Sequence, residues 1–400
     1  MIYVHVPFCR SFCTYCDFYS EVAARCRNAE DAVRQESLFE RYADALVAEI
    51  GIRKDEIQQA CTRSGVKTLY IGGGTPSVLP LGVLKRILDA LKEAGADSGF
   101  KEFTVEVNPE DIVDKGEAYV EGLLSLGVNR ISMGVQSFDD GILKWMNRRH
   151  DSGTAVRAYD ILESAGVDNI SIDLIFGLPQ ISDELWRETL KRALNISSRG
   201  ILPRHISSYQ LSVEPGSMLA RMVDKGMWNE ASDELCESQY RILCEELCKA
   251  GYHHYEISNF AIPGSEAVHN SAYWKHVPYI GLGPGAHSFI EVQSGPGEAV
   301  YMRKWNEGDL NGYLTAAQRG DFSEVTGSEI LDEEQMEMET AMLGLRTSSG
   351  LREEELLKCC DADAVHDALQ SGDLIHMHDG RIRIPESRFF VSDNIISSII

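Results

Sequence analysis

Short apolar runs rich in β-branched residues recur along the first 250 residues of the chain. Between them, apolar residues return every three or four positions, which is the period of an amphipathic helix. This alternation is typical of a parallel sheet with right-handed crossover connections. The expected strands are 2–6, 67–71, 102–107, 130–135, 171–175 and 205–211. The expected helices are 37–60, 81–94, 117–126, 153–165 and 183–197.

Six strand–helix units, each of roughly 30–40 residues, predict the α/β class and a partial or full β/α (TIM-like) barrel over residues 1–250. In such a barrel the active-site residues lie just after the carboxyl ends of the strands. A doubly wound open sheet has the same pattern and stays an alternative.

The pattern changes after residue 250. Residues 251–325 form an expected extension of the barrel, rich in aromatic residues, His, Gly and Pro up to residue 290 and continuing as a connection over 291–325. Residues 326–400 predict a C-terminal, mostly helical module with helices at 332–345, 353–359 and 363–370. A hairpin around Asp379-Gly380 follows these helices, so the module resembles a winged helix.

Composition excludes several classes of protein. Hydrophobic residues make up 44% and charged residues 25% of the 400 positions, as in ordinary globular chains. No apolar run reaches 18 residues, so we expect no integral membrane segment. The N-terminal residues lack the regions of a signal peptide, and we expect a cytoplasmic protein. The net charge of −24 disfavours nucleic acid as a partner.

Three of the ten cysteines follow the first expected strand with the spacing C-x3-C-x2-C: Cys9, Cys13 and Cys16. Thiolates are soft ligands that suit iron–sulfur clusters or zinc, but structural zinc requires a fourth ligand, which is missing nearby. A 4Fe-4S cluster held by three cysteines leaves one iron open to the amino and carboxylate groups of S-adenosylmethionine. Electron transfer from such a cluster can cleave the sulfonium and yield a 5′-deoxyadenosyl radical. A zinc knuckle or a plain cysteine-rich loop stays the alternative.

Polar residues and glycines stand at or near the ends of the later strands. Because these strand ends meet at one end of a barrel, we expect the residues to lie close together. Each one alone also fits a tight turn, a helix cap or a salt bridge. The residues are Gly72, Gly73, Gly74, Thr75, Pro76, Glu106, Gln136, Arg148 and Asp173.

Six motifs in this order (YVHVPFCRSFCTYCDF, GGGTP, EVNPE, SMGVQSF, DLIFGLP and HNSAYW) give the chain a resemblance to radical S-adenosylmethionine enzymes of the HemN/HemW group. The resemblance spans nearly the whole chain. It implies that three residues contact the cluster-bound S-adenosylmethionine: Tyr3, Gly73 and Glu106. It matches five positions to contacts with a second molecule in the oxidase branch: Gly74, Thr75, Gln136, Arg148 and Asp173. Tyr15, between two of the cysteines, would pack on adenine.

The group has two branches. One decarboxylates coproporphyrinogen III without oxygen, and the other binds heme and delivers it. The oxidase branch has a fourth cysteine where this chain has Phe18, and it carries an N-terminal extension where this chain has only eight residues before Cys9. Both differences favour a heme chaperone with little or no oxidase activity, whose partners are heme, a heme-acceptor protein and an electron donor for the cluster. The oxidase stays the alternative, and a radical enzyme that modifies tRNA is disfavoured by charge.

The sequence H-N-x-x-Y-W at 269–274 matches the heme motif of the chaperone branch. Imidazole is a good axial ligand for heme iron, so His269 is a candidate heme ligand. A structural loop is the alternative, and four nearby histidines compete: His253, His254, His276 and His287. The remaining cysteines are interpreted as buried or structural thiols: Cys26, Cys61, Cys236, Cys244, Cys248, Cys359 and Cys360.

Overall fold

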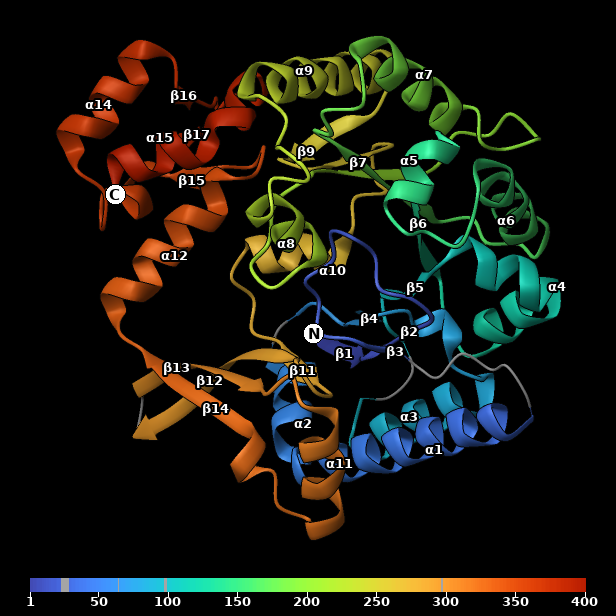
Figure 1. Ribbon diagram of the computed structural model, residues 1–400. Helices are drawn as coiled ribbons and strands as arrows, with labels where there is room; N and C mark the ends of the chain where they lie inside the picture. The colour runs from blue at the N-terminus through green and yellow to red at the C-terminus, as the bar shows by residue number, and fades with distance from the viewer. Residues whose placement is uncertain (23–28, 64, 97–98, 296–297) are drawn as a thin grey trace.

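The six strands expected from the sequence lie side by side in one sheet (Figure 1). The structure is a computed structural model that describes residues 1–22, 29–63, 65–96, 99–295 and 298–400; Cys26 lies outside the described residues. The parallel strands are β1 (Ile2–Val6), β4 (Thr68–Gly73), β5 (Glu102–Val107), β6 (Arg130–Gln136), β7 (Ile170–Phe176) and β8 (His205–Gln210).

Three further strands extend the edges of this sheet. Strand β11 (Ile280–Leu282) pairs in parallel with β1, whereas β10 (Asn259–Ala261) and β9 (His253–Glu256) continue antiparallel from β8. The full order is β11-β1-β4-β5-β6-β7-β8-β10-β9, and the two edge strands do not pair with each other. The expected barrel is therefore partial and open at one side.

Helices connect the strands and cover the outside of the sheet (Figure 1). The expected helix 37–60 is two helices that break at Arg53, and the expected helix 117–126 begins earlier, at Pro109. Gly116 has a φ of 69° inside that helix, which interrupts its periodicity and explains why the pattern shows only from residue 117. The helices are α1 (Ala29–Ile52), α2 (Lys54–Arg63), α3 (Leu81–Glu93), α4 (Pro109–Ser125), α5 (Asp140–Trp145), α6 (Ser152–Ser164), α7 (Asp183–Leu194), α8 (Met218–Asp224), α9 (Asp233–Lys249) and α10 (Val268–Trp274).

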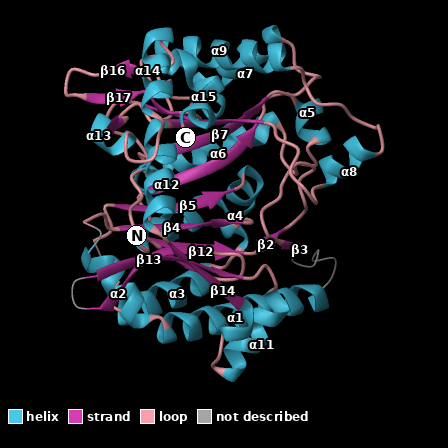
Figure 2. Cartoon of the chain, turned by 90° about the vertical axis from the view of Figure 1, so that its left-hand side faces the viewer, coloured by secondary structure: helices cyan, strands magenta, loops and turns pink. Residues whose placement is uncertain are grey.

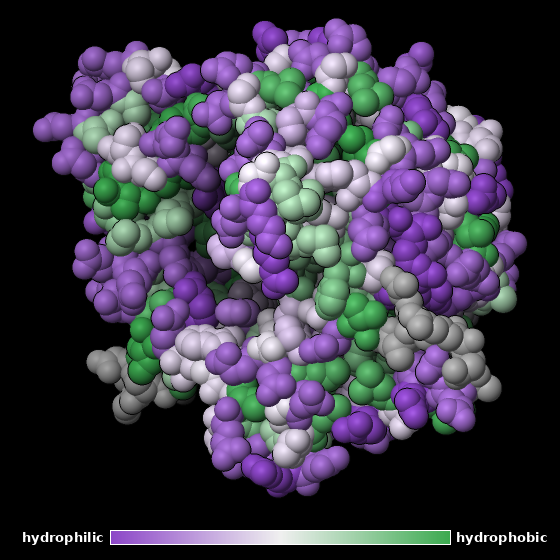
Figure 3. All heavy atoms as spheres, viewed as in Figure 1, coloured by the Kyte–Doolittle hydropathy of each residue, from purple (hydrophilic) through white to green (hydrophobic). Residues whose placement is uncertain are grey.

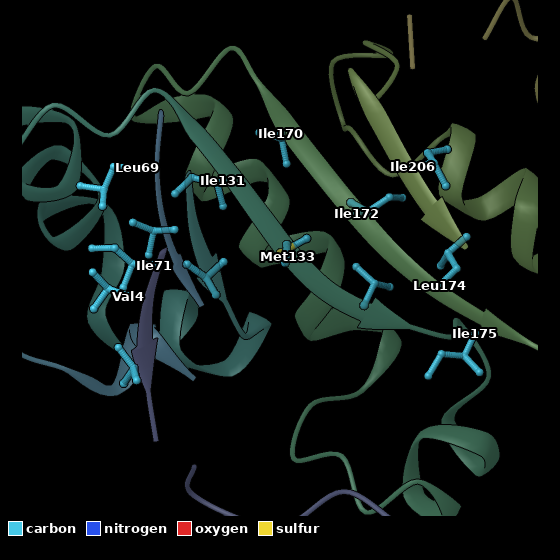
Figure 4. Packing of buried hydrophobic residues seen from close by; sticks show 14 of the residues in the cluster. Val4, Leu69, Ile71, Ile131, Met133, Ile170, Ile172, Leu174, Ile175 and Ile206 are labelled. Carbon is cyan, nitrogen blue, oxygen red and sulfur yellow. The ribbon is translucent and has the colours of Figure 1, made fainter. Parts of the chain in front are cut away.

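Successive side chains of a strand point to opposite faces of the sheet, and here the two faces differ in chemistry. One face is apolar and packs in the main hydrophobic core with the helices. Figure 4 shows its members Val4, Leu69, Ile71, Ile131, Met133, Ile172 and Ile206. The alternate positions are polar and lie on the inner face: His5, Tyr70, Thr104, Glu106, Arg130, Ser132, Asp173 and Ser207. The partial barrel therefore has an apolar outside and a polar inside.

Residues 291–325, which the sequence pattern left as a connection, contain regular structure. Strands β12 (His287–Gly295), β13 (Glu298–Asn306) and β14 (Thr326–Leu331) form a three-stranded antiparallel sheet, and α11 (Leu310–Arg319) links the last two. Helix α11 packs against α1, so this sheet is attached to the barrel at the helical layer. The sequence pattern did not indicate these strands, because antiparallel pairing between distant segments leaves little periodic signal in either one.

The C-terminal region is mostly helical, as expected, and Figure 2 looks onto it. Helix α12 begins with a capping box in which Asp332 and Gln335 bind each other's backbone N–H groups. The expected hairpin forms between β16 and β17. The elements are α12 (Glu333–Leu345), β15 (Leu351–Arg352), α13 (Glu353–Leu356), α14 (Ala362–Ser371), β16 (Ile375–His376), β17 (Arg381–Arg383) and α15 (Ser392–Ile399). Among the described residues, no helix is both long and apolar enough to cross a membrane.

A buried carboxylate on α1 joins this helix to elements from the other end of the chain. Glu49 is 1% exposed and accepts hydrogen bonds from the Gly283 backbone N–H (2.8 Å), the Tyr313 hydroxyl (2.6 Å) and the Asn306 amide (2.9 Å). The Arg53 guanidinium lies 3.1 Å from the same carboxylate. Four donors therefore satisfy one charge that would otherwise be costly to bury.

Substituting Glu49→Ala should lower the free energy of unfolding by about 3–5 kcal/mol, because it removes a buried charge partner of Arg53 and leaves the Gly283 N–H and the Tyr313 hydroxyl buried without an acceptor. Denaturant titration followed by circular dichroism measures this loss. The control is Asp89→Ala, which removes an exposed ion pair with Lys85 and should change stability by less than about 1 kcal/mol. Equal effects of the two substitutions would contradict the role given to Glu49.

Candidate functional site

The cysteine segment lies between two helices of the barrel. It starts at the short strand β2 (Phe8–Cys9) and ends at β3 (Glu21–Val22), which pairs with β2 in parallel. In its middle, Thr14 donates from its backbone N–H to the Met146 carbonyl and from its hydroxyl to the Trp145 carbonyl. Its own carbonyl accepts from the Leu219 N–H at the start of α8. These bonds hold the segment against α5 and α8.

The three cysteines line one cavity of about 410 Å³, which we call the cysteine cavity. The Cys9 sulfur lies 3.5 Å from the Thr75 hydroxyl, and the Cys13 sulfur lies 3.5 Å from a guanidinium nitrogen of Arg148. Burial raises the pKa of the Cys9 thiol and raises the pKa of Cys16 to about 12. The three cysteine sulfurs thus border the cysteine cavity, and the guanidinium of Arg148 lies beside them.

The sequence allows two kinds of metal centre at these cysteines, a zinc site or an iron–sulfur cluster. Within the described residues, no three His, Cys, Asp or Glu side chains are grouped closely enough to hold one metal ion. A 4Fe-4S cluster does not require such convergence, because each thiolate binds a different iron. The three cysteine side chains around the cavity therefore fit a cluster.

The glycine-rich loop after β4 lies directly against the backbone that leads to Cys9. The Gly74 N–H donates to the Val6 carbonyl (2.8 Å), and the Thr75 N–H donates to the Phe8 carbonyl (2.7 Å). A Cβ atom at Gly74 would lie only 2.7 Å from the Phe8 carbonyl oxygen. Glycine is required there because any side chain would push the two loops apart.

Two carboxylates line the cavity from the inner face of the sheet. Glu106 accepts from the Tyr70 hydroxyl (2.6 Å) and from the Gly73 N–H (3.1 Å), and burial raises its pKa to about 7. Asp173 accepts from the Ser132 hydroxyl (3.2 Å), and burial raises its pKa too. The buried guanidinium of Arg130 opposes both shifts. Each carboxylate can thus accept a cationic group with a gain in free energy.

Two further residues occupy constrained positions beside the cysteines. Gln136 has a φ of 66°, a conformation that is uncommon for a residue with a side chain. Arg148 donates to the Asn108 side-chain oxygen and to the Gly134 carbonyl, each at 2.7 Å. Backbone strain of this kind is concentrated at ligand-binding sites.

Most of the expected site residues line the cysteine cavity, although their roles there stay predictions. They are Cys9, Cys13, Cys16, Tyr15, Gly73, Gly74, Thr75, Glu106, Gln136, Arg148 and Asp173. Tyr3 does not line it, and its hydroxyl is hydrogen-bonded to His5 (2.9 Å).

His269 also lies outside the cavity. It is 1% exposed, and its ring nitrogens bind the hydroxyls of Thr68 (2.8 Å) and Tyr273 (3.0 Å). Its backbone N–H donates to Glu102. Thr68 and Glu102 begin their strands, so His269 sits at the end of the barrel opposite the cysteines. In this conformation neither ring nitrogen is available to a heme iron.

Several cavity residues were missed by the sequence analysis. They occupy alternate positions of the strands, between residues of the apolar face, and this alternation was the signal that could have found them. They are Tyr70, Arg130, Ser132, Ser207 and Tyr209.

A family model and a solved structure are similar to this chain. The family model described as the radical SAM superfamily matches residues 3–193. The solved structure of coproporphyrinogen III oxidase (HemN) from Escherichia coli aligns with a TM-score of 0.75 and covers 99% of this chain and 89% of that chain. The sequence identity in that alignment is 22%, so it establishes the fold alone.

Curated relatives are more similar in sequence. The heme chaperone HemW of Lactococcus lactis is 34% identical over 352 residues, which covers 87% of this chain and 82% of that protein. The heme chaperone HemW of Bacillus subtilis is 32% identical and covers 87% of this chain and 84% of that protein. The chain therefore belongs to the HemW family of radical S-adenosylmethionine proteins.

Proposed function

We propose that this chain binds a 4Fe-4S cluster, S-adenosylmethionine and heme, and that it passes heme to an acceptor protein. One observation carries the proposal: three cysteines, a glycine-rich loop and two buried carboxylates line one cavity in a chain whose relatives are named heme chaperones. The family implies the cluster and S-adenosylmethionine. The transfer of heme, and the residues that act in it, are our proposal.

In this proposal Cys9, Cys13 and Cys16 hold the cluster, which supplies one-electron chemistry when bound. Glu106 accepts hydrogen bonds from the amino group of S-adenosylmethionine, because its carboxylate faces the cavity with only neutral donors bound to it. The backbone of Gly73, whose N–H already orients Glu106, borders the same place. Tyr3 lies behind this group, with its ring 6.1 Å from that of Tyr70. It would therefore act by positioning Tyr70.

The remaining expected contacts form the opposite side of the cavity. Arg148 supplies a cation near Cys13, and Asp173 supplies a carboxylate on β7. Gln136 and Thr75 supply neutral polar groups, and Gly74 leaves room for the backbone to approach. We propose that these groups position the rest of the bound cosubstrate, or a second molecule, and that Tyr15 packs on adenine.

Heme transfer requires two partners that lie outside the chain. An electron donor must reduce the cluster, and an acceptor protein must take up heme. We do not assign the heme iron to His269, because both of its ring nitrogens are hydrogen-bonded in the interior.

Replacing Cys13 by Ala should abolish cluster assembly, because two thiolates do not hold a cubane cluster with an open iron. After anaerobic reconstitution, metal analysis should give about four irons per wild-type chain and almost none for the variant. Cys248→Ala on α9 is the matched control, since this cysteine is exposed and lies outside the cavity. Zinc in place of iron in the wild-type chain would exclude the cluster.

Hemin titration and a coproporphyrinogen III assay separate the chaperone from the oxidase. We expect a saturable change in the Soret band with one hemin per chain, and no decarboxylated product in the presence of reductant and S-adenosylmethionine. Catalytic formation of product would favour the oxidase instead. Absence of saturable hemin binding would exclude a function as a heme chaperone.

The affinity for S-adenosylmethionine should rise with pH, because Glu106 accepts hydrogen bonds from the amino group of the cosubstrate best when it is ionised. With a pKa of about 7, Glu106 changes from about one-tenth to about nine-tenths ionised between pH 6 and pH 8. Calorimetry on the reconstituted protein should therefore show about a tenfold increase in affinity over this range. In Glu106→Gln the affinity should be lower and should rise less steeply with pH. If the affinity of that variant rose with pH as steeply as that of the wild-type chain, the titrating group would be another residue and not Glu106.

A further inference from the structure

The size of the cysteine cavity limits what else can bind inside it. Its volume of about 410 Å³ is near the lower end of the range, about 300–1,000 Å³, that pockets use to enclose one drug-sized ligand. In the proposed function this space holds the cluster and S-adenosylmethionine, so a flat metalloporphyrin would lie across the mouth of the cavity or elsewhere on the protein.

Three aromatic side chains line the cavity and remain exposed. Phe12 precedes Cys13 and is 48% exposed, and Phe18 follows Cys16 by two residues and is 65% exposed. Tyr209, at the carboxyl end of β8, is 44% exposed. Single exposed aromatic residues are common, but these three line the same cavity, so their faces are open to a ring system that enters or covers it. In Figure 3, hydrophobic atoms are visible among hydrophilic ones where the β2–β3 segment reaches the surface.

A free cation stands beside this aromatic surface. Arg149 is exposed, lines the cavity and makes no ion pair or hydrogen bond with the residues that the structure describes. It is two residues from Asn147, whose side chain donates to the Phe12 carbonyl (2.6 Å), so it lies near Phe12. Arg10, a partly buried cation of the lining, is already paired with Asp111 and Asp114. An unpaired guanidinium in a chain of net charge −24 can receive a carboxylate.

Carboxylates also line the cavity, and they restrict how an anionic ligand can bind. Asp17 is exposed next to Phe18, and Glu214 accepts from the Ser212 hydroxyl (2.6 Å). A ligand with negative charge on all sides would be repelled by these groups. A ligand with its carboxylates on one edge and an apolar opposite edge can direct the charged edge to Arg149.

We infer that heme lies across the mouth of the cysteine cavity, stacked on Phe12, Phe18 and Tyr209, with its propionate edge at Arg149. This inference rests on the proposed function, and it places the bound heme at the mouth of the cysteine cavity. Heme has the required shape and charge distribution: a flat apolar ring with two carboxylates on one edge. In this position it lies next to the cluster-bound cosubstrate and is open to an acceptor protein from outside.

The test compares hemin with its dimethyl ester, in which both propionates are neutral, on the reconstituted wild-type chain and on substituted chains. The wild-type chain should bind hemin about tenfold more tightly than the ester. Arg149→Glu should weaken hemin binding by about tenfold and leave ester binding unchanged, whereas Arg149→Lys should retain most of the preference. Phe18→Ser should weaken both ligands by about tenfold.

Ile201→Ser is the matched control, because Ile201 is 52% exposed and lies before β8, away from the cavity lining. Iron content and circular dichroism show whether each variant is folded and loaded. A wild-type chain without saturable hemin binding would remove the proposed function and this inference with it. Equal affinities of the wild-type chain for hemin and for the ester would overturn this inference and leave the proposed function standing. Unchanged hemin affinity in the Arg149→Glu and Phe18→Ser variants would do the same. Variants that slow cluster reduction but bind hemin normally would assign the mouth to the electron donor.

Discussion

The constraint on which this structure depends is the difference between the two faces of its parallel sheet. Outward residues such as Leu69 and Ile131 are completely buried against the helices and supply the hydrophobic free energy of folding. Inward residues such as Arg130 and Asp173 are polar, so the interior of the partial barrel cannot close on itself as an apolar core. Polar groups in such a place need partners, and the sheet provides them across neighbouring strands, as between Ser132 and Asp173. A polar cavity is the result.

Access of the cysteines to that cavity depends on backbone contacts rather than on side chains. The glycine-rich loop after β4 binds the carbonyls of Val6 and Phe8, on either side of the turn into the cysteine segment. Thr14 fixes the middle of the segment to the end of α5. The positions of the three thiols are therefore set by the barrel, because both anchors belong to the connections that follow barrel strands.

Buried polar groups also join parts of the chain that are far apart in sequence. Glu49 connects α1 to the turn after β11, to β13 and to α11. His269 connects α10 to β4, at the end of the barrel away from the cysteines. Both residues have all their hydrogen-bonding atoms satisfied, which is the arrangement expected of polar groups that stabilise an interior. The conspicuous H-N-x-x-Y-W motif thus has a structural explanation at its histidine, while its neighbour Asn270 reaches the cavity lining.

The sequence by itself determined the strand–helix order, the cysteine motif and the polar residues at strand ends, because each depends on local periodicity or on spacing within one loop. It did not determine that Tyr3 and His269 lie outside the cavity, that Tyr70, Arg130 and Tyr209 line it, or that β12, β13 and β14 form a sheet. Only the tertiary structure decided these points. The depth of a side chain along a barrel depends on the register between neighbouring strands, and pairing between distant strands depends on contacts that no single segment contains.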